Sequence, residues 1–142
     1  MDGSVLLLAN YAERTESGLI SAIGLGWSVT GSPTSQSALV LLLKVPWDQT
    51  NVRHHASVTL NTADGQRSRF VDGSDGPQLE FDFETGRPPG IEHGVALDVT
   101  QAFNVSPLPL APGRYSWDLV IDARPVAQRA FTVREVLSHP LG

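Results

Sequence analysis

A chain of 142 residues is long enough for one domain, and folding at this length buries roughly 68–70% of the surface that the unfolded chain exposes. Its net charge of −5 argues against nucleic acids and anionic membranes as partners, because both are negatively charged. The chain has no cysteine, which excludes disulfides, iron–sulfur clusters and thiol catalysis.

The first predicted strand covers residues 4–11. Its apolar run, Val5 to Ala9, follows a segment from Met1 to Ser4 that carries one acid and no base. The run is too short for the core of a signal peptide and far too short for a membrane span. We therefore expect a buried first strand in a soluble, cytoplasmic protein.

Further strands follow at near-regular intervals, separated by clusters rich in Gly and Pro. They are predicted at residues 19–30, 37–45, 54–62, 66–71, 78–84, 91–103, 113–122 and 126–134. From Tyr115 to Ile121, large apolar side chains alternate with polar ones, which is the period of a half-buried strand. We predict an all-β fold, an immunoglobulin-like antiparallel β-sandwich of eight to nine strands. It would occupy residues 1–136 and be followed by a mobile C-terminal tail over 137–142.

The predicted core consists of the side chains on the inward face of these strands. They are Leu7, Ile23, Leu25, Trp27, Leu41, Leu43, Val58, Leu60, Phe70, Leu79, Phe81, Val95, Leu97, Val99, Tyr115, Trp117, Leu119, Phe131 and Val133.

One hairpin is predicted together with its register. Residues 67–71 would pair with residues 78–82 around a turn at 72–77, which sets Phe70 opposite Leu79 on the inner face. The outer face then carries two arginine–carboxylate pairs, each of which contributes roughly 0.2–1 kcal/mol. A slip of one residue would bury these charges.

The strand at 37–45 is apolar on both faces, whereas a sandwich strand normally has one face in water. One interpretation is that loops or neighbouring segments cover its second face. The other is an exposed apolar patch with Val40 and Leu42, which would bind a protein partner or a second copy of the chain. In the strand at 19–30, small residues alternate with Leu19, Ile23 and Leu25 and permit close approach, most often of another backbone.

The polar residues predict no catalytic, metal or cofactor site. His54 and His55 are neighbours on a strand and point to opposite faces, so they cannot bind one ion together. His93 is in line with core-facing residues of its strand, which indicates a hydrogen-bonded inward or rim position, and His139 falls in the predicted tail. No zinc-ligand spacing, nucleophile elbow or carboxylate pair across a cleft is evident. We therefore predict that the chain is not an enzyme.

Trp47 is the most informative single residue for function. It follows a proline at the end of a buried strand, where its ring either plugs one end of the sandwich or stays exposed. An exposed indole stacks on a sugar or anchors a protein contact. Arg87 and Pro88, in the loop at 86–90, would complete the rim of such a site.

Five stretches spread over nearly the whole chain carry a resemblance to known sequences. They are Leu7–Ala12, Gly18–Trp27, Val45–Asp48, Gly86–Gly90 and Leu110–Trp117. As a set they resemble an uncharacterised family of small bacterial β-sandwich proteins that is common in actinobacteria. The resemblance implies a β-sandwich fold and a bacterial cytoplasmic setting. It implies no activity and no catalytic residues.

The sequence thus predicts a non-enzymatic structural or protein-interaction module that can assemble with itself. Its partner would be a protein or a second copy, and neither nucleic acid nor membrane. The alternative is a small-ligand or carbohydrate-binding domain with Trp47 at the rim of the site.

Overall fold

A computed structural model describes residues 1–135 and shows that this part of the chain is built of strands. The predicted tail and His139 lie outside the described residues. The strands are β1 (Val5–Ala9), β2 (Tyr11–Arg14), β3 (Ile20–Ile23), β4 (Val29–Thr30), β5 (Ser37–Val45), β6 (His54–Thr62), β7 (Gln78–Phe83), β8 (Leu97–Val105), β9 (Gly113–Ile121) and β10 (Arg124–Val133). A short 3₁₀ turn, η1 (Trp47–Gln49), follows β5. Within residues 1–135 no helix is long and apolar enough to cross a membrane.

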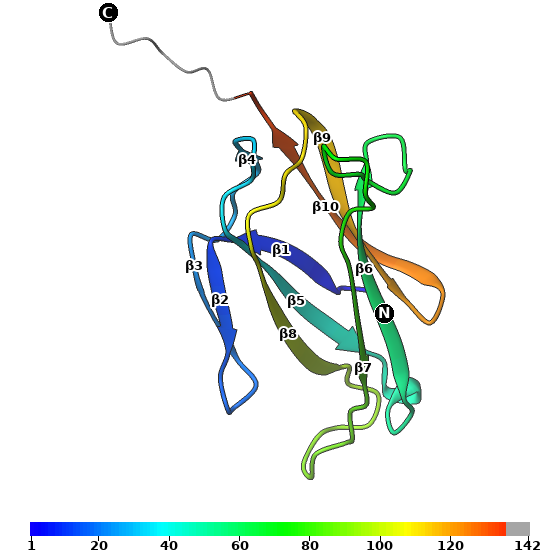
Figure 1. Cartoon of the computed structure of the whole chain (residues 1–142). Coiled ribbons are helices and arrows are strands. Elements are labelled where there is room, and N and C mark those ends of the chain that lie inside the picture. The colour runs from blue at the N-terminus through cyan, green and yellow to red at the C-terminus, as the bar shows by residue number, and fades with distance from the viewer. Residues whose placement is uncertain (136–142) are drawn as a thin grey trace, which may run out of the picture.

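Two sheets form the body of the molecule (Figure 1). One has the order β1-β5-β8 and the other the order β4-β10-β9-β6-β7, while β2 and β3 form a separate two-stranded ribbon. Neighbouring strands are antiparallel except β4, which pairs in parallel with β10. The all-β prediction is therefore confirmed.

The core lies between the two sheets, because alternate residues of each strand point inward. Its buried members include Leu6, Leu8, Leu39, Leu41, Leu43, Val58, Leu60, Tyr115, Trp117, Leu119, Phe131 and Val133. Most of the predicted core is thus confirmed, and Trp27, Phe70, Leu79, Phe81 and Val99 pack against it half-buried.

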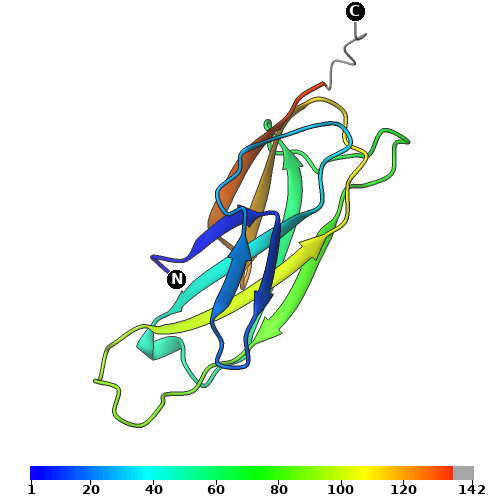
Figure 2. The same ribbon diagram turned by 90° about the vertical axis from the view of Figure 1, so that its left-hand side faces the viewer.

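The β2–β3 ribbon covers the outer face of β5, which explains why this strand is apolar on both sides. The chain bends at Asn10 between β1 and β2, and the ribbon lies across β5 and β8 (Figure 2). Val40 is only 2% exposed and packs with Ala12 and Ala38 in a second small cluster. Val40 is therefore not available to a partner, and the prediction of an exposed patch there is wrong.

The side chain of Asn104 makes the two backbone hydrogen bonds to the ribbon that a neighbouring strand would make. The carboxamide of Asn104 on β8 accepts a hydrogen bond from the N–H of Ala12 (3.2 Å) and donates one to its C=O (2.8 Å). Arg14 Nε donates to the C=O of Thr100, 3.1 Å away, also on β8. These bonds fix β2 on the outside of the three-stranded sheet.

Three residues predicted in the core are exposed. The predicted strand at 19–30 is broken into β3 and β4, and it leaves Ile23 and Leu25 at the surface. Val95 is exposed because β8 begins only at Leu97. In the ribbon, alternation shows which residues share a face, but that face points to solvent.

The predicted hairpin between residues 67–71 and 78–82 is also wrong. β7 pairs with β6 instead, with Val58 opposite Leu79 and Ser57 opposite Glu80. Residues 67–71 form only isolated bridges, to Asn61 and Asp75. β6 has an apolar inner face and offers β7 a full antiparallel partner. The pairing of β7 with β6 is therefore more stable than the pairing with the nearer residues 67–71.

Candidate functional site

One end of the sandwich brings together two of the predicted site residues, Trp47 and Arg87. The guanidinium carbon of Arg87 lies 4.1 Å from the centroid of the half-buried Trp47 ring, a cation–π contact. Arg87 Nη2 donates to the C=O of Trp47 (2.7 Å), and its Nε donates to Thr50 Oγ1 (2.7 Å). The ring of His93 packs at 4.9 Å from the indole, so His93 lies at the surface beside Trp47. Pro88 is exposed next to Arg87.

A shallow depression of about 460 Å³ lies beside Trp47. Its lining residues are Met1, Asp2, Lys44, Pro46, Trp47, Asp48, Gly94 and Ala96. Lys44 is paired with Asp98 on β8, so its charge is partly compensated. The depression offers an apolar floor with a few charged groups at its rim, and one face of the indole is occupied by Arg87.

A buried histidine holds η1 in place beneath this site. His54 Nδ1 lies 2.5 Å from Asp122 Oδ2, and His54 Nε2 lies 2.8 Å from the C=O of Gln49, the last residue of η1. A carboxylate and a carbonyl both accept hydrogen bonds, so this geometry favours the protonated imidazole, in which both ring nitrogens donate. The ring of Phe83 stacks on it at 5.2 Å.

The electrostatics agree with a charged His54. Burial lowers its pKa, but the hydrogen bonds to Asp122 and Gln49 outweigh burial and raise the pKa above its ordinary 6.5. The hydrogen bond from His54, followed by the one from the N–H of His55, lowers the pKa of Asp122. A histidine that acts as a general base needs a free ring nitrogen, and here neither is free. The pair fixes η1 and thereby the position of Trp47.

Sequence reasoning did not find this pair. His54 and Asp122 are 68 positions apart, and only the sheet order places the start of β6 beside the turn between β9 and β10. That turn has two residues, Asp122 and Ala123, with φ of 50° and 67°, the left-handed values that a tight hairpin requires. Its sequence carries no glycine, so the signal that marks such turns is absent.

A second candidate surface is the edge of β3, because most other sheet edges are closed. At β1 the C=O groups of Leu6 and Leu8 accept hydrogen bonds from Arg129 Nε (2.9 Å) and from the N–H of Gly26 (2.7 Å). Trp27 Nε1 donates to the C=O of Ala9 at the end of the same strand (2.8 Å). These contacts leave β1 few free acceptors for another strand.

The remaining edges are protected in other ways. At β8, Arg14 covers the C=O of Thr100. β7 carries Glu80 and Asp82 on its solvent face, and charged side chains on an edge discourage pairing with another chain. β4 has only two residues, and the part of β10 that β4 leaves unpaired carries the exposed charges of Arg124 and Arg129.

β3 has neither a cap nor a charge. Its residues are Ile20, Ser21, Ala22 and Ile23, and within residues 1–135 β2 is its only sheet neighbour. Leu19 and Ile23 at its two ends are 66% and 68% exposed, and Tyr11 lies opposite Ile23 on the same ribbon. An unpaired strand with exposed apolar side chains has free backbone groups with which another strand can pair.

Leu42, the other residue predicted for the apolar patch, is 37% exposed on the outer face of β5. Its neighbours across the sheet are Val5 and Thr100, and the next outward residue along the strand is Lys44. With Val40 buried, Leu42 and the half-buried Val5 lie between polar Thr100 and Lys44 and do not form a large apolar patch.

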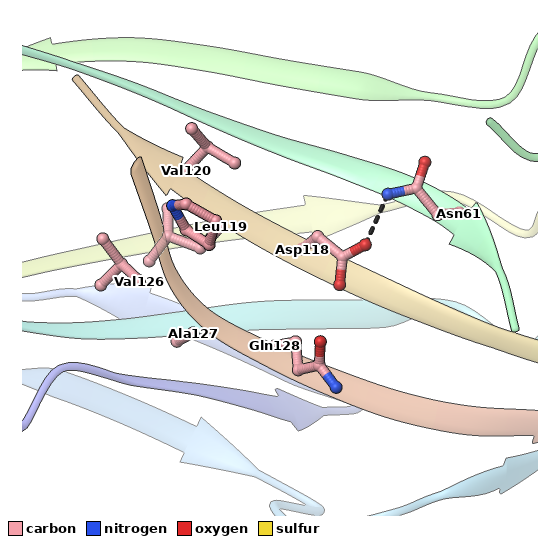
Figure 3. Close-up of a pocket in the computed structure, with 8 residues that line it drawn as sticks. Asn61, Asp118, Leu119, Val120, Val126, Ala127 and Gln128 are labelled. Atoms are coloured by element: carbon pink, nitrogen blue, oxygen red, sulfur yellow. Dashed lines mark hydrogen bonds between the residues drawn. The ribbon is translucent and has the colours of Figure 1, made fainter. Parts of the chain in front are cut away.

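A second hollow lies on the outer face of the five-stranded sheet (Figure 3). It lies where β10 bulges between Pro125 and Ala127, which leaves the extra residue, Val126, without a partner on β9. Asp118 accepts hydrogen bonds from Asn61 and from Ser116. Both of its oxygens are therefore occupied, and the hollow offers little free polar chemistry.

Comparison with known families shows the family to which the chain belongs. A family model described as a family of unknown function, DUF6941, matches residues 4–134. The chain belongs to this family. The matched range contains every strand from β1 to β10. No curated protein matches the sequence.

Proposed function

We propose that the chain is a non-enzymatic protein-interaction module that adds a strand of a protein partner to the free edge of β3. The observation that carries the proposal is the contrast between this edge and the others. The edges of β1 and β8 are capped by side chains or a backbone N–H, β7 is charged, and β4 is two residues long. β3 is uncapped, uncharged and flanked by exposed Leu19 and Ile23.

The direction of the backbone groups supports strand addition. The N–H and C=O of Ala12 both point to Asn104, away from β3. Successive residues of a strand point these groups to opposite sides, so Tyr11 and Glu13 pair with β3. In β3 the groups of Ser21 and Ile23 therefore face β2, and those of Ile20 and Ala22 face the free edge. In strand addition the backbone bonds supply affinity and the alternate side chains supply specificity.

The test is selection of binders from a display library of random ten-residue peptides on the immobilised chain. We expect enriched peptides in which apolar residues alternate, as in a strand. Binding should be lost with Ala22→Pro, which removes an N–H that faces the free edge and is tolerated at an unpaired position. It should be kept with Val71→Lys, a change at an exposed apolar residue away from β3. Peptides that bind Ala22→Pro as well as the unchanged protein would contradict the proposal.

A second candidate function is binding of a small ligand or carbohydrate beside Trp47. The depression next to the half-buried indole favours it, because a filled or flat surrounding would leave no room. The measurement is binding to a glycan array, with Trp47→Ala as the comparison. Signals that vanish with Trp47→Ala support the site, and an array without signals, or with signals that Trp47→Ala leaves unchanged, counts against it.

We further propose that the protein acts in the bacterial cytoplasm with a protein as its partner. The resemblance to small bacterial β-sandwich proteins and the net charge of −5, which disfavours nucleic acid and anionic membrane, support this setting. Fractionation of native cells with an antibody against the chain tests it, and recovery outside the cytoplasm would contradict it.

A further inference from the structure

We infer that the strand added at β3 is β3 of a second copy of this chain, in a two-fold dimer with Ser21 on the axis. The inference rests on the proposed function and names its partner. In the dimer the two ribbons join into one antiparallel sheet of the order β2-β3-β3-β2.

The edge of β3 is the place where charge repulsion between two copies is small. The net charge of −5 makes two copies repel over most of their surfaces, but β3 itself carries no charge. The nearest acid on the outer face of the ribbon is Glu13, which lies opposite Ser21. In the dimer the two Glu13 residues are three strand spacings apart, about 14 Å, which exceeds the screening length at physiological salt. Like charges therefore do not oppose pairing at this edge.

The register follows from which backbone groups are free. Ile20 and Ala22 present N–H and C=O groups to the edge, so a two-fold ladder pairs Ile20 of one copy with Ala22 of the other. Ser21 then lies opposite Ser21 of the second copy. Leu19 lies opposite Ile23 of the second copy, and this apolar contact occurs twice, once on each side of the axis.

The side chains of β3 suit this pairing. The large residues Leu19 and Ile23 are at the ends of the edge and on its outer face, while the centre is occupied by the small residues Ser21 and Ala22. Small central residues let the two backbones approach, and the large ones cover the ladder from solvent. The same edge is used by both copies, so the assembly closes at two and does not grow.

The test uses a single introduced cysteine. The chain has no cysteine of its own, so Ser21→Cys carries the only thiol. In this register the residues at position 21 form a non-hydrogen-bonded pair with Cα atoms about 4.5 Å apart, which is within the range of a disulfide. We expect mild oxidation to convert Ser21→Cys into a covalent dimer, whereas Val71→Cys, equally a surface cysteine, stays mostly monomeric.

Solution mass is measured in parallel over a hundredfold range of concentration. We expect twice the mass of one chain at the upper end, and association at least tenfold weaker for Ile23→Lys. The side chain of Ile23 is exposed, so a cooperative thermal transition at low protein concentration will show that this variant still folds. Val71→Lys should associate like the unchanged protein.

The outcomes separate this inference from the proposed function. A chain that stays monomeric but selects strand-like peptides overturns the dimer and keeps strand addition. A dimer that forms a disulfide through Ala22→Cys and not through Ser21→Cys overturns the register. A dimer that Ile23→Lys does not weaken uses another surface and overturns the inference. If no peptides are selected and the chain does not associate, the proposed function is contradicted as well.

Discussion

Asp122→Asn should destabilise the fold in a way that depends on pH. Asp122 Oδ2 accepts a charged hydrogen bond from His54 Nδ1 at 2.5 Å, and Oδ1 accepts one from the N–H of His55 at 3.0 Å. An asparagine keeps an acceptor for the N–H, but it removes the negative charge that His54 faces. Neutral His54 then donates only to Gln49, and the charge-assisted bond is lost.

The magnitude follows from the exposure of the pair. Hydrogen bonds to charged groups contribute about 1.5–3 kcal/mol, and the Asp122 side chain is 48% exposed, so solvent screening selects the lower end, about 1.5 kcal/mol. For a chain of this length that loss lowers the melting temperature by about 3–6 °C.

The sign of the pH dependence comes from the directions of the two pKa shifts. The pKa of His54 is raised above 6.5 by its hydrogen bonds to Asp122 and Gln49, which outweigh burial. Its contribution is therefore complete below pH 6.5 and is lost as the pH rises through the raised value. The pKa of Asp122 is lowered below 3.8 by the hydrogen bond from His54, so its contribution is present above that pH and is lost in stronger acid. The effect of Asp122→Asn should be largest between these limits.

The assay is urea unfolding of the unchanged protein and of Asp122→Asn at pH 5.5 and pH 9. The hydrogen bond with Asp82 also raises the pKa of His55, which titrates in the same range, so both proteins are compared in a His55→Gln background. We expect a gap in unfolding free energy at pH 5.5 that narrows at pH 9. An equal gap at both pH values, or a His54 pKa below 6.5 by NMR, would refute the reasoning.

Four further substitutions test local packing by thermal or urea unfolding. Ala123→Gly should stabilise the chain by about 0.5–1 kcal/mol, since Ala123 has a φ of 67° that glycine adopts without strain; a loss of stability would contradict this. Gly76→Ala should lower the free energy of unfolding by about 1–3 kcal/mol, because a Cβ there would lie 2.0 Å from the Oγ of buried Ser68. Ser68→Ala should leave the stability nearly unchanged, because the Ser68 hydroxyl has no hydrogen-bond partner. Asn104→Ala should cost about 1–3 kcal/mol through its two bonds to Ala12 and should speed amide exchange in the ribbon; unchanged exchange would show that other contacts hold the ribbon.

The period of the apolar residues correctly predicted the strands that pack one face into the core between the two sheets. β5 and β6 begin and end where their apolar patterns do, and β9 buries the alternating residues from Tyr115 to Ile121. The pattern could not tell that the second apolar face of β5 is covered by β2. That cover depends on Asn104, whose bonds to Ala12 span 92 positions of the chain.

In the candidate sites too, local sequence predicted some residues, and others could be found only from long-range contacts. Trp47 and Arg87 were each singled out from local sequence, and the structure places one over the other. The His54–Asp122 pair had no local signal, because its partners meet only when β6 and β9 become neighbours. Small residues in the segment of Leu19 to Leu25 indicated close approach of another backbone, but alternation alone assigned Ile23 to the core. A period reports a shared face, and only the packed structure reports whether that face meets protein or water.

Specific contacts keep the other edges of these sheets closed. Arg129 and Trp27 reach across to carbonyl groups of β1, and Arg14 does the same at β8. Each contact orders a long or bulky side chain, which costs conformational entropy. β3 lacks any such contact, yet it has the most exposed apolar flanks of the edges in residues 1–135. An open apolar edge invites aggregation unless another strand occupies it. The contrast between edges that are capped, charged or very short and the unprotected edge of β3 is therefore the physical basis for expecting β3 to pair with another strand.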